Sequence, residues 1–104
     1  MHLEDVARLA QRRGVARNAV LLGAYGFEGD YRARMRGWLA ALPAHGALLF
    51  CHPGQAPGAD EADALPDPIA PARQREFAYL GSDAFARDLA DAGVTLSRRW
   101  PVAE

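Results

Sequence analysis

Residues 47–54, Ala-Leu-Leu-Phe-Cys-His-Pro-Gly, constrain the fold most, because an apolar run ends there in a histidine followed by two turn-forming residues. Four or five apolar residues between Gly46 and Pro53-Gly54 are typical of a strand buried on both faces, as in a parallel sheet covered by helices. His52 would then lie at the carboxyl end of this strand, where ligands collect in α/β sheets and barrels. Pro53 biases His52 toward an extended conformation, and Gly54 lets the chain turn. His52 is therefore the first functional candidate, with an ordinary surface histidine as the alternative.

Length and charge restrict the class of protein further. A chain of 104 residues predicts a single domain over 1–104. Its 12 basic and 13 acidic residues give a net charge of −1, and the arginines are scattered, so we expect no nucleic-acid partner. No apolar stretch approaches the roughly 20 residues that span a bilayer, so no membrane association is expected. The amino-terminal residues lack the pattern of a secretory signal, and a cytoplasmic location is predicted.

Apolar periodicity and turn residues predict seven elements along the chain. They are a helix over 3–13, a strand over 19–22, a helix over 31–42, a strand over 47–51, helices over 71–80 and 82–92, and a strand over 94–97. Asp30 is the expected cap of the second helix. The apolar stripe of this helix is expected to face the core, and it consists of Tyr31, Met35, Trp38, Leu39 and Leu42. The proline-rich stretch between Gly54 and Pro71 is expected to be a long acidic loop. An α/β fold with three parallel strands and four helices follows from this order.

A glycine-rich loop with two aromatic residues, Tyr25 and Phe27, follows the first predicted strand. If the strands are parallel, this loop lies at the same edge of the sheet as His52. Aromatic faces beside a histidine suit a sugar or another flat apolar ligand surface. The alternative is that both rings close the mouth of the core.

Four segments in fixed order resemble the carboxyl-terminal pattern of a known enzyme family. They are Gly26-Phe27-Glu28-Gly29-Asp30-Tyr31, His52-Pro53-Gly54, Arg73-x-x-Glu76-x-x-x-Leu80-x-Ser82-Asp83-x-Phe85 and Gly93-Val94-x-Leu96. The pattern is similar to that of the YdjC-like carbohydrate deacetylases, the ChbG/HpnK-type enzymes. The resemblance implies part of a distorted (β/α) barrel and metal-dependent removal of the acetyl group from an N-acetylated sugar.

The resemblance also implies roles for individual residues. A histidine opposite the metal would protonate the departing amine, and His52 is our candidate for that role or for a role in orienting the substrate. Tyr25, Phe27, Pro53 and Gly54 are the candidate substrate-binding residues.

Three neighbouring residues receive structural roles. Arg73 and Glu76 lie three positions apart on one predicted helix, so an ion pair between them is expected to support the end of the long loop. Cys51 is expected in the core, because successive strand side chains point to opposite faces and a Cys51–His52 dyad would not form.

The family's divalent metal, Mg²⁺ or Zn²⁺, is held by an Asp-Asp motif and two histidines from an amino-terminal half. This sequence has no Asp-Asp pair, and neither His2 nor His45 matches those ligands. We therefore expect no strong metal binding by this chain, which resembles a truncated carboxyl-terminal portion that is inactive alone. A non-catalytic α/β module that binds a sugar or a protein is the alternative. A partial barrel would expose strand edges and apolar surface, so self-association to a homo-oligomer is expected.

Overall fold

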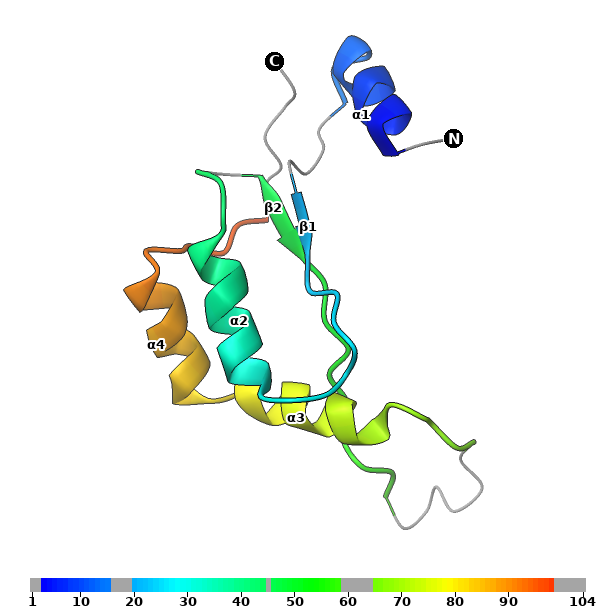
Figure 1. Ribbon diagram of the computed structural model, residues 1–104, viewed down its shortest axis with the longest axis vertical. Coiled ribbons are helices and arrows are strands. Elements are labelled where there is room, and N and C mark those ends of the chain that lie inside the picture. The colour runs from blue at the N-terminus through cyan, green and yellow to red at the C-terminus, as the bar shows by residue number, and fades with distance from the viewer. Residues whose placement is uncertain (1–2, 16–19, 45, 59–64, 99–104) are drawn as a thin grey trace.

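Four helices and two strands form the fold in the computed structural model, which describes residues 3–15, 20–44, 46–58 and 65–98. The elements are α1 (Leu3–Arg12), β1 (Val20–Leu22), α2 (Tyr31–Ala40), β2 (Ala47–Leu49), α3 (Ala70–Leu80) and α4 (Asp83–Asp91) (Figure 1). Their order agrees with the order predicted from the sequence up to the end of α4. His2 and His45 lie outside the described residues.

The two strands pair in parallel, with Val20 opposite Ala47 and Leu22 opposite Leu49. Helix α2 connects them, so this part of the chain is the β-α-β unit that the sequence predicts. Asp30 caps α2 as expected, because its Oδ1 accepts a hydrogen bond of 3.2 Å from the backbone N–H of Ala33. Both strand ends therefore open on the same edge.

The expectation of three parallel strands in part of a barrel is wrong. The sheet within the described residues has two strands, and residues 94–97 belong to neither a strand nor a helix. The backbone N–H of Val94 instead donates to the carbonyl of Leu89, which closes the end of α4. Leu96 is 72% exposed and buries little apolar surface. The alternation of apolar and polar residues suits a strand, but here a contact with the preceding helix outweighs that local preference.

The core lies between α2, α3 and α4, which pack against one another (Figure 1). Its buried side chains are Tyr31, Met35 and Leu39 from α2 and Tyr79 from α3. The predicted apolar stripe of α2 is confirmed, since its remaining members, Trp38 and Leu42, pack partly buried against this cluster.

A buried carboxylate ties the three helices together. Asp88 of α4 accepts two hydrogen bonds of 3.0 Å from the guanidinium of Arg32 on α2, and one of 2.6 Å from the hydroxyl of Tyr79 on α3. These contacts, Arg32 first, lower the pKa of Asp88 below its ordinary value. The bundle that supports the sheet is thus held by polar as well as apolar contacts.

One face of the sheet is partly exposed within the described residues. Leu21 and Leu48 stand opposite each other in the ladder and are 55% and 37% exposed. Figure 1 shows α1 apart from the other helices, beyond the start of β1. No helix in the described part of the chain is long and apolar enough to cross a membrane.

Candidate functional site

The loops that leave β1 and β2 meet at the carboxyl edge of the sheet and bring the predicted site residues together. The ring of His52 lies 5.3 Å from that of Phe27 and 5.4 Å from that of Phe50, measured between centroids, and both contacts are edge-to-face. Tyr25 contacts Phe27 at 5.1 Å and also packs against the core. Tyr25 therefore closes the mouth of the core, as the alternative interpretation of the loop expects, and joins the core to the surroundings of His52.

One nitrogen of the His52 ring is enclosed. Within the described part of the chain, Nδ1 is buried and has no hydrogen-bond partner. Which nitrogen faces a ligand decides what the imidazole can donate or accept there.

Glu76 does not form the predicted ion pair with Arg73. Its side chain is 0% exposed and points into the protein from α3. Oε1 accepts a hydrogen bond of 2.6 Å from the backbone N–H of His52, and Oε2 accepts one of 2.5 Å from the hydroxyl of Tyr25. One buried carboxylate thus connects the loop after β1 with the loop after β2.

Arg73 does brace the end of the long loop, but its acidic partner is Asp67, with Nε and Oδ2 2.6 Å apart. Nη1 of Arg73 also lies 3.5 Å from the carbonyl oxygen of His52. The backbone N–H of Gly54 donates to the carbonyl of Arg73 at 3.1 Å, and a Cβ on Gly54 would lie only 3.3 Å from the Arg73 side chain. A glycine at 54 thus allows the turn after His52 to lie against α3, while Pro53 is exposed.

Phe27 adopts a left-handed backbone conformation, with φ of 60°. This region is uncommon for a bulky residue and costs roughly 1–3 kcal/mol, so other contacts must hold the loop. Arg75 donates to the carbonyl of Phe27 at 2.8 Å, and Arg34 donates to the carbonyl of Glu28 at 3.2 Å. The guanidinium of Arg34 also lies 5.3 Å from the centroid of the Tyr25 ring. Two arginines from different helices therefore fix the conformation that carries Phe27.

The phenol of Tyr25 is a second titratable group at this site. Burial, followed by the hydrogen bond to Glu76, raises the pKa of Tyr25 to about 12, while Arg75 and Arg34 act in the opposite direction. Burial also raises the pKa of Tyr31 and of Tyr79. The folded state therefore favours the neutral form of all three tyrosines in the sequence.

Stability should consequently fall at alkaline pH. The folded state raises the pKa of these phenols. The stability that the neutral phenols contribute is therefore complete below their ordinary pKa of 10.0, and for Tyr25 it is lost as the pH rises through about 12. Lysine, which would titrate in this range, is absent from the sequence. We expect the melting temperature to decline from pH 10 upward, and to decline less steeply in Tyr25→Phe than in the protein that keeps Tyr25. Both proteins carry Cys51→Ser, so that no thiol titrates in this range. An unchanged melting temperature up to pH 12 would contradict the tyrosine environments described above.

Some features of the site were not anticipated from the sequence. Phe50 is two residues before His52 and so shares its side of an extended chain, a spacing that could have identified it. Arg34 and Arg75 give no such signal. Cys51 is exposed, not in the core, because β2 ends at Leu49 and the strand alternation no longer applies.

A metal ion does not fit the described part of this site. Within residues 3–15, 20–44, 46–58 and 65–98, no three histidine, cysteine, aspartate or glutamate side chains are grouped as metal ligands. Glu76 uses both oxygens on protein donors, and Asp67 is paired with Arg73.

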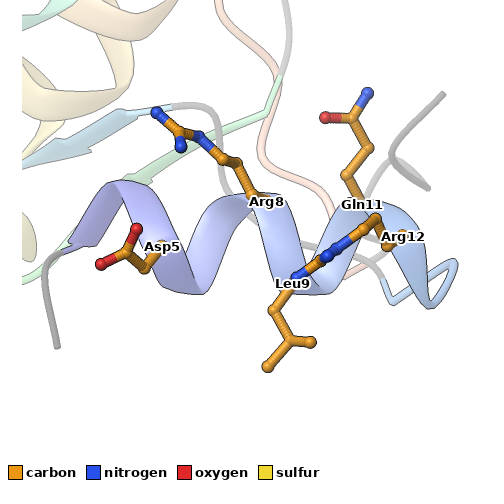
Figure 2. A pocket seen from close by; sticks show the side chains of 5 residues that line it. All are labelled: Asp5, Arg8, Leu9, Gln11 and Arg12. Carbon is orange, nitrogen blue, oxygen red and sulfur yellow. The ribbon is translucent and has the colours of Figure 1, made fainter.

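A wide hollow of about 730 Å³ lies along α1. It is lined by Asp5, Arg8, Leu9, Gln11 and Arg12, all from one helix. Figure 2 shows Arg8 and Gln11 extending on one side of this helix and Leu9 on the other. Since the lining comes from one helix and includes none of the predicted site residues, we place the candidate site at His52.

No family model, no curated protein and no solved structure matches this chain. The residues around His52 and their geometry are therefore the basis on which a function is proposed.

Proposed function

We propose that this chain supplies the carboxyl-terminal, substrate-facing part of a metal-dependent carbohydrate deacetylase, which hydrolyses the N-acetyl group of an amino sugar. One observation carries the proposal. Phe27, His52 and Glu76 come from three separate segments of the family-like pattern, and they meet at one edge of the sheet. A cytoplasmic location is part of the proposal, in keeping with a single cysteine that cannot form an internal disulfide.

The geometry suggests a division of roles. In hydrolysis of an acetamide, water adds to the carbonyl carbon, the C–N bond breaks, and the departing nitrogen takes up a proton. His52 lies at this edge of the sheet and would donate a hydrogen bond or a proton to this nitrogen, or orient a sugar oxygen. Phe27 offers an aromatic edge or face to the apolar side of a sugar ring. The Tyr25 hydroxyl is already bonded to Glu76, so we assign it a supporting role.

A divalent ion in such an enzyme polarises the acetyl carbonyl and activates water. The described residues of this chain do not fit that ion, so we derive no step through it. Since the sequence also lacks the Asp-Asp motif of the family, we propose that an additional polypeptide segment holds the metal.

Binding of an acetylated sugar by the full chain tests this proposal. We expect isothermal titration calorimetry to detect weak binding of N,N′-diacetylchitobiose, and weaker or no binding of the glucosamine disaccharide that lacks both acetyl groups. His52→Ala should abolish the preference for the acetylated disaccharide, because it removes the group proposed to face the acetamide nitrogen. Gln74→Ala, an exposed change on α3, is the matched control and should bind as the parent chain does.

Three outcomes would overturn or change the proposal. No binding of either disaccharide would reject it. Equal binding of the acetylated, deacetylated and glucose disaccharides would favour a non-catalytic sugar-binding module. We expect no acetate release by the chain with added Zn²⁺ or Mg²⁺, and release that a chelator abolishes would contradict the need for a separate metal-holding segment.

A further inference from the structure

Glu76 has a set of contacts that a residue needed only for helix packing would not require. It is a fully buried acidic residue, and both of its carboxylate oxygens accept hydrogen bonds from groups far away in the sequence. A carboxylate removed from water is costly unless donors replace the lost hydration. Here the two donors, His52 N–H and Tyr25 O–H, belong to the two loops that form the candidate site.

The backbone of His52 is held on both sides. Its N–H donates to Glu76, and its carbonyl oxygen lies 3.5 Å from Nη1 of Arg73 on the same helix. The loop that carries Phe27 is held at Tyr25 by the same carboxylate. The ring of His52 then lies against the rings of Phe27 and Phe50, with Nδ1 enclosed.

We propose that Glu76 is the positioning residue of this site: its carboxylate fixes the loop after β1 relative to the loop after β2, and so holds the His52 imidazole against Phe27 and Phe50 at the edge of the sheet. The identity of a ligand at this edge rests on the function proposed above. The positioning itself does not, since it concerns contacts within this chain.

The chemistry of the contact explains why a carboxylate suits this position. Both partners are donors, and a carboxylate is an acceptor at each oxygen. Hydrogen bonds to an ionised group are shorter and stronger than bonds between neutral groups. Glutamine keeps the length of the side chain but offers one acceptor and one donor, so the Tyr25 hydroxyl would have to accept instead of donate. Aspartate keeps the charge but is shorter by one methylene, so it would not reach both loops from the same position on α3.

These differences define an NMR test on the full chain without any sugar. In Glu76→Asp, we expect the His52 ring protons to lose the ring-current shifts caused by Phe27 and Phe50. In Glu76→Gln, we expect those ring shifts to remain, the His52 amide proton to move upfield and the pKa of Tyr25 to fall. Asp88→Asn is the control, because it alters another buried carboxylate whose partners are Arg32 and Tyr79. It should destabilise the fold and leave the His52 ring shifts unchanged.

A purely structural role for Glu76 predicts a different result. Glu76→Asp would then lower the stability as Asp88→Asn does, with the His52 ring shifts unchanged, and this would overturn the proposal. If Glu76→Asp does not fold, Glu76→Gln decides, and an unchanged His52 amide shift together with an unchanged Tyr25 pKa would overturn it. Because sugar is absent, failure here is distinguishable from failure of the proposed deacetylase function, which the calorimetric comparison of disaccharides tests separately.

Discussion

Glu76→Ala is expected to destabilise the fold by roughly 2–4 kcal/mol. The substitution leaves the N–H of His52 and the hydroxyl of Tyr25 without their acceptor, and each unsatisfied buried donor costs about 1–3 kcal/mol. Removal of a buried charge returns part of this loss. Small domains are stable by about 5–15 kcal/mol, so the change should be plain in urea unfolding followed by circular dichroism.

The control for this variant lies on the same helix. Gln74 is exposed, so Gln74→Ala should change the free energy of unfolding by no more than about 0.5 kcal/mol. A Glu76→Ala protein as stable as Gln74→Ala would show that the two hydrogen bonds of the carboxylate contribute little, and the description of Glu76 as the connection between the loops would be wrong.

Gly23→Ala is expected to have an effect of similar size for a steric reason. Gly23 lies directly after β1 with φ of 111°, a conformation that residues with a side chain rarely adopt. A Cβ at this position would lie 2.1 Å from the backbone carbonyl oxygen of Phe50, which is two residues before His52. Backbone strain and overpacking each cost about 1–3 kcal/mol, so we expect a loss of roughly 3 kcal/mol in the free energy of unfolding.

Gly37 provides a matched control within the same chain. It lies in α2, and a Cβ there would meet nothing within 4 Å. Alanine favours the helix over glycine by about 0.5–1 kcal/mol, so Gly37→Ala should raise the stability. If Gly23→Ala were as stable as the parent chain, the close approach of Gly23 to the carbonyl oxygen of Phe50 would have to be wrong.

Local sequence patterns were sufficient to predict much of this fold. The spacing of Tyr31, Met35 and Leu39 identified α2 and its buried side, and the apolar runs that end before Gly23 and His52 identified the two strands. The meeting of Tyr25, Phe27 and His52 at one edge followed from parallel strands alone. These features depend on periodicity and on chain direction, which a sequence carries directly.

Other features depend on contacts that no local pattern contains. Residues 94–97 alternate like a strand, but Val94 is drawn to the end of α4, and the two-stranded sheet does not include them. The spacing of Arg73 and Glu76 suits an exposed ion pair. Glu76 instead faces inward and accepts hydrogen bonds from Tyr25 and His52, which lie 51 and 24 residues away in the sequence. The packing of α3 against the loops after β1 and β2 decides whether Glu76 pairs with Arg73 or faces inward.

We propose that the edge of the sheet at His52 binds an N-acetylated sugar. The most direct measurement is a series of amide ¹H–¹⁵N correlation spectra of the full chain with increasing N,N′-diacetylchitobiose. We predict that the signals of Phe27, His52 and Gly54 shift together with a single dissociation constant, while those of α1 and α4 stay unchanged. Shifts confined to α1, or no shifts at concentrations of sugar that saturate other chitobiose-binding proteins, would contradict the claim.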